Sequence, residues 1–177
     1  TREQNGMDML YVRVANLNGV CVYAVESPLG EINLRAFEPF IDAALQEYAS
    51  IRAIGFGLPG IEVDGQIVGG DYPTLTGTAF FFFYRERYQL PVVIENDVNA
   101  ACVGYVRRHQ LESGAALYLY FPQKYPPGGG IYINDQLYKG YSNYAGEVSG
   151  MPLGIDWHDP TLYQSLARAC EAIATLI

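Results

Sequence analysis

The sequence predicts an α/β fold with a mixed sheet and flanking helices, and two observations support this prediction. Strand-like segments alternate along the chain with segments of helical length and periodicity, which is typical of α/β proteins. The segment Pro91-Val-Val-Ile-Glu95 is apolar at successive positions and precedes a predicted helix. A continuously apolar strand of this kind is expected in a parallel sheet that is buried on both faces.

The predicted strands are short and rich in β-branched and aromatic residues. They cover residues 9–17, 20–26, 51–58, 91–95, 115–121 and 130–134. Asn18-Gly19 and Asn134-Asp135 each predict a hairpin turn, because these residue types tolerate the backbone conformations that tight hairpins require. Residues 63–67 predict a further small hairpin.

The predicted helices cover residues 36–49, 77–88, 97–109 and 160–177. The apolar face of the first carries Phe40, Ala44, Leu45 and Tyr48. The second is expected to begin near Thr76 or Thr78, because threonine is a common N-cap residue.

A run of four phenylalanines in the second helix leaves two interpretations open. Phe80, Phe83 and Tyr84 can share one face of the helix, so Phe81 and Phe82 must point elsewhere. Either a wide core covers them, or they form a subunit interface in a homodimer.

The composition narrows the class of protein. The 177 residues suffice for one sizeable domain or two small lobes, and 50% of them are hydrophobic. The net charge of −8 repels phosphate backbones, so this segment is not expected to bind nucleic acid. Cys21, Cys102 and Cys170 are too far apart for a metal-binding pair, and we expect three reduced, mostly buried thiols in a cytoplasmic protein. The sequence has no recognisable signal peptide and no apolar run of membrane-spanning length, so no membrane partner is expected.

Three segments carry residues suited to ligand chemistry. In the first, Asp97 follows a buried strand and begins a helix, a position where open α/β sheets bind ligands. Asp97 can accept a proton from a substrate hydroxyl, and Asn96 can hydrogen-bond a neighbouring hydroxyl. The alternative is that Asp97 serves only as the helix N-cap.

The other two segments are rich in glycine. Gly55-Phe-Gly57-Leu-Pro59-Gly60 ends a strand in a tight turn that lets a ligand approach the backbone. Residues 128–150 begin with three glycines, of which Gly128 and Gly129 can offer backbone N–H groups to a phosphate. They also contain Glu147, which can bind sugar hydroxyls. The alternatives are that residues 55–60 form an ordinary turn, that residues 128–150 form a flexible loop, and that Glu147 is a surface residue.

Taken together, these segments resemble the ROK family of bacterial sugar kinases and transcriptional regulators. The resemblance depends on G-x-G-x-P-G at residues 55–60, E-N-D-x-N-A-A at residues 95–101, and G-G-G-I-x-I-N-x-x-L-Y-x-G with A-G-E at residues 128–147. Their order and spacing both fit, and the match covers most of residues 9–155.

The resemblance implies an actin-like ATPase (ribonuclease H-like) fold of two α/β lobes. We expect residues 1–109 to form part of the first lobe and residues 110–177 the start of the second, with the chain incomplete at both ends. The resemblance also implies that Asp97 acts as the catalytic base if the protein is a kinase. Asn96, Asp97, Glu147 and the backbone near Gly60 are expected to bind the sugar, and Gly128 and Gly129 the phosphates of ATP.

The sequence departs from the family at its phosphate and zinc motifs. The first phosphate motif, Asp-x-Gly-Gly-Thr, does not precede Asn18, and Pro126 and Pro127 stand where the second phosphate loop of the family has glycines. Proline has no N–H to donate to a phosphate. Gly150 replaces the histidine that links the sugar to a structural zinc in many members, and no cysteine cluster follows. His158 is therefore expected to be a loop residue, not a metal ligand.

We therefore expect a sugar-sensing effector domain of a ROK-type transcriptional regulator that is degenerate as a catalyst. Its ligand is a small-molecule sugar, and DNA would be bound by a helix-turn-helix outside this segment. No cofactor and no zinc are expected. The alternatives are an ATP-dependent hexose kinase, which needs ATP and Mg²⁺, and a structural member that binds no sugar.

Overall fold

The computed structural model describes residues 2–4, 7–111, 114–122, 125–148, 156 and 170. The chain divides into two compact units, Thr1–Ala101 and Cys102–Ile177. The predicted lobe boundary after residue 109 stays a prediction. The predicted helix over residues 160–177 lies outside the described residues, apart from Cys170.

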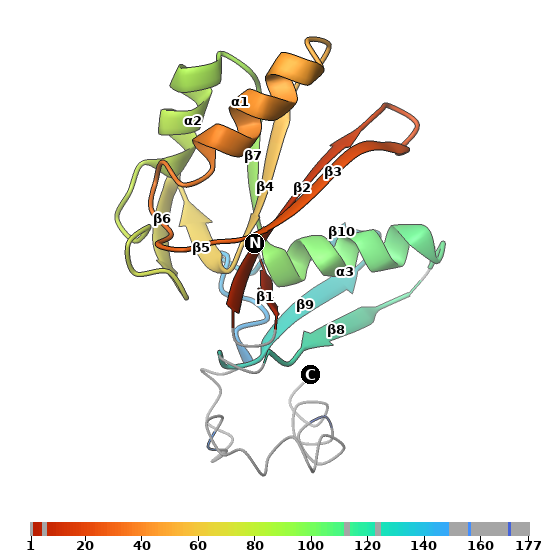
Figure 1. Ribbon diagram of the computed structural model, residues 1–177. Coiled ribbons are helices and arrows are strands. Elements are labelled where there is room, and N and C mark those ends of the chain that lie inside the picture. Colours follow the sequence, from red (N-terminus) through yellow and green to blue (C-terminus); the bar gives the residue numbers. More distant parts are fainter. Residues whose placement is uncertain are drawn as a thin grey trace. The chain divides into compact units, whose positions relative to one another are not determined.

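The first unit begins with an antiparallel sheet of three strands in the order β1-β2-β3 (Figure 1). The strands are β1 (Arg2–Gln4), β2 (Met7–Ala15) and β3 (Cys21–Pro28). The predicted two-residue turn between β2 and β3 is wrong in length. The Asn16 N–H donates to the Val20 carbonyl at 3.0 Å, and Gly19, with φ of +76°, completes a three-residue loop.

The first unit also contains a parallel strand pair and a small hairpin. β4 (Ile54–Leu58) pairs in parallel with β7 (Val92–Asn96), which agrees with the parallel sheet expected for residues 91–95. However, Val93 is 62% exposed, so β7 is not covered on both faces. β5 (Gly60–Val63) and β6 (Gln66–Gly70) form the predicted hairpin, and Asp64 and Gly65 at its turn have φ of 51° and 85°.

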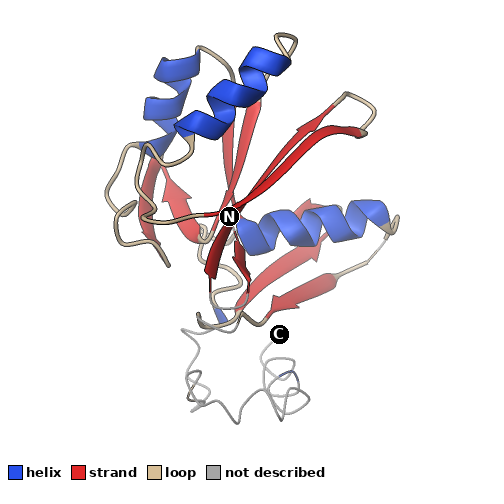
Figure 2. Cartoon of the chain, in the orientation of Figure 1, coloured by secondary structure: helices blue, strands red, loops and turns tan. Residues whose placement is uncertain are grey.

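Helices α1 (Glu38–Glu47) and α2 (Phe80–Tyr88) lie side by side (Figure 2). The guanidinium of Arg87 on α2 contacts the carboxylate of Glu38 on α1 at 2.9 Å. The predicted threonine cap of α2 is wrong, because its N-cap is Ala79 and no side chain caps it. The Thr78 hydroxyl instead donates to the Leu75 carbonyl at 2.6 Å.

The core of the first unit forms where α1, α2 and the strands meet. Phe80 and Tyr84 are fully buried, and their rings pack with those of Phe37 and Phe56. Phe81 packs against this core, whereas Phe82 is 45% exposed. Packing against the core therefore accounts for Phe81 but not for Phe82. The homodimer stays a prediction.

The second unit contains an antiparallel sheet in the order β10-β9-β8. The strands are β8 (Ala116–Tyr120), β9 (Gly128–Ile133) and β10 (Gln136–Leu137). Asn134 and Asp135 have φ of 52° and 59° and form the predicted two-residue turn between β9 and β10. Helix α3 (Asp97–Arg108) runs across the boundary between the units.

The cysteines differ in burial. Cys102 on α3 packs with Val106 and Tyr132, and burial raises the pKa of its thiol. Cys21 is exposed, which corrects the expectation of mostly buried thiols, because it lies at the start of β3, next to the hairpin loop. Within the described part of the chain, no helix is both long and apolar enough to cross a membrane.

Candidate functional site

The predicted sugar-binding residues of the first unit gather where β4 and β7 end. These strands are parallel neighbours, and Leu58 and Asn96 occupy paired positions at their carboxyl ends. Asp97 begins α3 directly after β7, and Gly60 begins β5 two residues after β4. The carboxyl edge of a parallel sheet is the place where α/β folds bind ligands. The fold therefore brings Asn96, Asp97 and Gly60 together.

The Asn96 side chain holds this corner in shape. Its Oδ1 accepts hydrogen bonds from the backbone N–H groups of Val98 and Asn99, both at 3.0 Å. Its Nδ2 donates to the Gly60 carbonyl at 3.3 Å. Asn96 is thus the N-cap of α3 and also joins the helix start to β5. An asparagine amide has two N–H donors, and among the described residues the Asn96 amide donates to the Gly60 carbonyl alone.

Asp97 is half-buried at the first position of α3. Its Oδ1 accepts a hydrogen bond from the N–H of the next residue, Val98, at 2.9 Å. The positive end of the helix dipole favours a carboxylate here. Since Asn96 satisfies the N–H groups of both Val98 and Asn99, capping alone does not account for an aspartate at position 97.

Asn99 is a buried polar residue of this corner that the sequence analysis did not single out. It is only 4% exposed, and its side-chain Oδ1 accepts no hydrogen bond from the described residues. Its presence in E-N-D-x-N was visible in the sequence, but burial is a tertiary property that the motif does not reveal.

The glycines near Gly60 are needed for close packing of two strands. Gly60 pairs with Gly70 in the β5–β6 hairpin. A Cβ on Gly60 would lie 2.9 Å from the Gly69 carbonyl oxygen, and Gly70 has a φ of +143°. The backbone at this turn is therefore fixed by packing, with the Gly60 carbonyl directed to Asn96.

In the second unit, the A-G-E segment is attached to the glycine strand. The Gly129 N–H donates to the Gly146 carbonyl at 2.7 Å, and Gly146 has a φ of +93°. A Cβ on Gly146 would collide with the Gly129 carbonyl, so only glycine fits this position. Glu147 follows, half-buried, with its N–H donating to the Tyr144 carbonyl at 3.2 Å.

The described residues of this segment do not fit a nucleotide phosphate. The Gly129 N–H is already bonded to Gly146, and Gly128 lies in the β8–β9 ladder opposite Tyr120. Pro126 and Pro127 have no N–H. The role of Gly128 and Gly129 in phosphate binding, predicted from the glycine cluster, stays a prediction that this geometry does not support.

No group of three His, Cys, Asp or Glu side chains in the described ranges is placed to hold a metal ion. Gly150, His158 and Asp159 lie outside those ranges. The expected absence of zinc therefore remains a prediction.

Comparisons with known proteins give the relatives of the chain. The ROK family matches residues 24–164. The chain is 31% identical over 126 residues to the xylose repressor of Bacillus subtilis, an alignment that covers 68% of the chain and 31% of the repressor. The chain therefore spans about a third of the length of this curated relative.

Two solved structures show a similar fold. A ROK family transcriptional regulator, a homologue of the E. coli MLC protein, superposes with a TM-score of 0.68 at 19% identity, over 78% of the chain and 37% of the regulator. A ROK family glucokinase from Streptomyces griseus, in complex with glucose and AMPPNP, superposes with a TM-score of 0.67 at 21% identity, over 78% of the chain and 46% of the kinase. These likenesses assign the α/β fold of this family, an actin-like ATPase fold.

Proposed function

The chain belongs to the ROK family, and from this premise we propose that it is the sugar-sensing effector part of a transcriptional regulator that transfers no phosphate. The observation that carries the proposal is the contrast between the two candidate sites. The corner formed by Asn96, Asp97 and Gly60 is intact and suited to hydroxyl groups. In the glycine segment, the Gly129 N–H is bonded to the Gly146 carbonyl, which weighs against phosphate binding there.

In this proposal Asp97 and Glu147 accept hydrogen bonds from sugar hydroxyls. Hydrogen bonds to a carboxylate are stronger than those between neutral groups, which suits recognition of a neutral polyol. Asn96 contributes its remaining N–H, and its bond to Gly60 keeps the corner in position. The similarity to a xylose repressor makes xylose the first sugar to test.

Contact with DNA is assigned to a helix-turn-helix outside this segment. The segment itself carries a net charge of −8, which opposes binding to a phosphate backbone. The alternative function, an ATP-dependent sugar kinase, is supported by the fold of the glucokinase. Phosphoryl transfer depends on holding the phosphates and their metal in position, so the unfavourable geometry at Gly129 weighs against it.

The test compares sugar affinity and ATP turnover in the whole protein, using Asp97→Ala, Asp97→Asn and the control Glu86→Gln. Glu86 is an exposed carboxylate on α2, so its replacement should leave affinity unchanged. Asp97→Ala leaves a sugar hydroxyl unpaired, which costs about 1–3 kcal/mol, or roughly a tenfold to hundredfold loss of affinity. Asp97→Asn should lose less, because its amide oxygen still accepts a hydrogen bond.

The outcomes separate the three candidate functions. Sugar binding without turnover, weakened by Asp97→Ala, supports the regulator. Robust turnover in the wild type that disappears in Asp97→Asn while binding persists identifies a kinase, because an amide cannot act as a base. If no sugar from a broad panel binds the wild type, the protein is a structural member of the family.

A further inference from the structure

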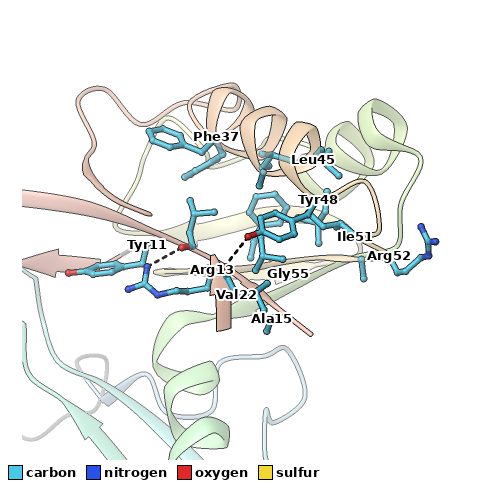
Figure 3. A pocket seen from close by; sticks show the side chains of 18 of the residues that line it. Tyr11, Arg13, Ala15, Val22, Phe37, Leu45, Tyr48, Ile51, Arg52 and Gly55 are labelled. Carbon is cyan, nitrogen blue, oxygen red and sulfur yellow. Dashed lines mark hydrogen bonds between the residues drawn. The ribbon is translucent and has the colours of Figure 1, made fainter. Parts of the chain in front are cut away.

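The first unit contains a cavity of about 700 Å³ that is separate from the proposed sugar-binding residues (Figure 3). It is lined by β2, by β4 and by apolar side chains of α1 such as Leu45. Its lining includes neither Gly60 nor Asn96 and Asp97. The cavity therefore does not extend that site. A surface that does continue from a proposed sugar-binding residue lies in the second unit, next to Glu147.

Exposed tyrosines are concentrated in the loop that precedes Glu147. Residues 138–144, here called the tyrosine loop, read Tyr-Lys-Gly-Tyr-Ser-Asn-Tyr. The side chain of Tyr141 is fully exposed, and those of Tyr138 and Tyr144 are about half exposed. Large aromatic groups that gather on a surface mark binding sites, because their faces are apolar while the tyrosine hydroxyl remains polar.

Both sides of the tyrosine loop are attached to strand β9. The Tyr138 N–H donates to the Ile131 carbonyl at 2.7 Å. After the loop, the Gly146 carbonyl accepts from the Gly129 N–H, also at 2.7 Å. The chain thus leaves β9 at one residue and returns to it two residues away, as in a compact surface loop whose ends lie close together.

A further contact closes the base of the tyrosine loop. The Ala145 N–H donates to the Lys139 carbonyl at 3.1 Å. Gly140 has a φ of +70°, and a Cβ on it would lie 3.3 Å from the Cβ of Ala145, so glycine lets the two sides of the loop meet. The tyrosines are therefore carried on a backbone that is already held in place, which lowers the entropy cost of binding a ligand.

A turn places Tyr144 next to Glu147. The Glu147 N–H donates to the Tyr144 carbonyl at 3.2 Å, which is the bond of a four-residue turn. In such a turn the first and fourth Cα atoms are less than about 7 Å apart. With covalent bonds of about 1.5 Å, a six-membered sugar ring and its hydroxyl oxygens span roughly 6 Å. A sugar that donates to Glu147 therefore lies within reach of the Tyr144 ring.

Tyr141 extends this surface beyond one sugar ring. It is three residues farther from Glu147 than Tyr144 is, which allows up to about 11 Å between the Cα atoms of the two tyrosines. Because one sugar ring spans roughly 6 Å, two linked rings match the two tyrosines better than one ring does.

We propose that the tyrosine loop is a second sugar subsite, and that the ligand is a disaccharide or longer saccharide whose second ring packs against Tyr144 and Tyr141. The inference rests on the proposed binding of the first ring by Asp97 and Glu147. The C–H face of a sugar ring packs on an aromatic ring, while its hydroxyls bond to polar groups such as the exposed Ser142.

The composition of the tyrosine loop favours a saccharide over a protein as its occupant. The centre of a protein–protein interface is apolar and largely free of water. Residues 138–144 include no alanine, valine, leucine, isoleucine or methionine, and between the tyrosines they carry only Lys, Gly, Ser and Asn. Aromatic faces that alternate with small polar groups suit a ring that presents both C–H and O–H groups.

Calorimetry on the whole protein tests the subsite with matched sugars: xylose against xylobiose, and glucose against maltose and cellobiose. In the wild type, the preferred disaccharide should bind about tenfold more tightly than its monosaccharide, a difference of about 1.4 kcal/mol. Tyr141→Ala should abolish this difference and leave the monosaccharide affinity unchanged, because Tyr141 contacts only the second ring. Tyr141→Phe should retain the difference, because the aromatic face is kept.

Tyr144→Ala and Tyr105→Ala form a matched pair. Tyr144 is 52% exposed, and Tyr105, which lies on α3 outside the loop, is 51% exposed. Tyr144→Ala should weaken the binding of both monosaccharide and disaccharide, since Tyr144 is next to Glu147. Tyr105→Ala should change neither affinity.

The outcomes distinguish failure of this inference from failure of the proposed function. If monosaccharide and disaccharide bind equally well, or if the disaccharide preference survives Tyr141→Ala, the second subsite is overturned. Monosaccharide binding that Asp97→Ala weakens would then still support the proposed function. Failure of every sugar to bind overturns both. If Tyr141→Ala changes the oligomeric state in sedimentation experiments and not the disaccharide affinity, the loop is a protein contact and the subsite is overturned.

Discussion

Replacement of Asn96 tests whether its side chain holds the ligand corner. Asn96→Ala removes the two cap bonds to Val98 and Asn99 and the bond to the Gly60 carbonyl. Loss of an N-cap costs about 0.5–2 kcal/mol. Loss of the bond to a half-buried carbonyl adds about 0.5–1.5 kcal/mol. We therefore expect a decrease of about 1–3.5 kcal/mol in the free energy of unfolding.

Asn96→Asp separates the two contributions. A carboxylate still accepts from the N–H groups of Val98 and Asn99, and its charge is favoured at a helix N-terminus by about 0.3–1 kcal/mol. It cannot donate to the Gly60 carbonyl, so that bond alone is lost. The expected cost is about 1 kcal/mol or less, smaller than that of Asn96→Ala.

The assay is urea denaturation of the whole protein, followed by fluorescence and circular dichroism to detect separate transitions of its parts. The control is Asn18→Ala, at an exposed position of the β2–β3 loop, which should change stability by about 0.5 kcal/mol or less. A stability of Asn96→Ala equal to that of this control, or an Asn96→Asp as destabilising as Asn96→Ala, would contradict this role of the Asn96 side chain.

Three further predictions concern pH, zinc and DNA. Burial raises the pKa of Tyr84 above its ordinary value. The pKa of Tyr88 is raised to about 12, first by burial and second by the hydrogen bond and negative charge of Asp42. The folded state therefore retains both phenol protons. The resulting stabilisation is complete below the ordinary pKa of 10.0 and is lost as the pH rises through 12, which alkaline denaturation should show. Tyr84→Phe should weaken this pH dependence. It should also lower the free energy of unfolding by about 1–3 kcal/mol, because the Leu34 carbonyl loses its 2.6 Å bond. Elemental analysis should find no stoichiometric zinc, and one zinc per chain would contradict the interpretation of Gly150. In gel-shift experiments these 177 residues alone should not bind duplex DNA at physiological salt, and sub-micromolar binding would refute the charge argument.

The local features of the fold followed directly from the sequence. The strands β4 and β7 lie within about three residues of their predicted bounds, and hairpin turns form as predicted at Asp64-Gly65 and Asn134-Asp135. These features depend on residues close together in the chain. The predicted start of α2 was wrong, because the Thr78 hydroxyl donates to the Leu75 carbonyl and does not cap the helix. The presence of a threonine in the sequence does not reveal which group its hydroxyl will bond.

The candidate site was predictable only as a set of residues. The motif E-N-D-x-N identified Asn96 and Asp97, and the fold places both at the carboxyl end of β7. The motif did not reveal that Asn96 caps α3 and reaches Gly60, because that carbonyl is 36 residues away in the chain. It also did not reveal the burial of Asn99.

The sequence by itself determined the α/β class, the family and the order of the elements, since periodicity, turn residues and motif spacing are all written along the chain. Only the tertiary structure decided how the polar groups are used. It joins the Asn96 amide to the Gly60 carbonyl, and it bonds the Gly129 N–H to Gly146 where a phosphate would need it. It also brings residues of β2 and β4 together along the lining of one cavity. A backbone group or strand edge is satisfied by whichever partner folding brings near it, and that partner is distant in the chain.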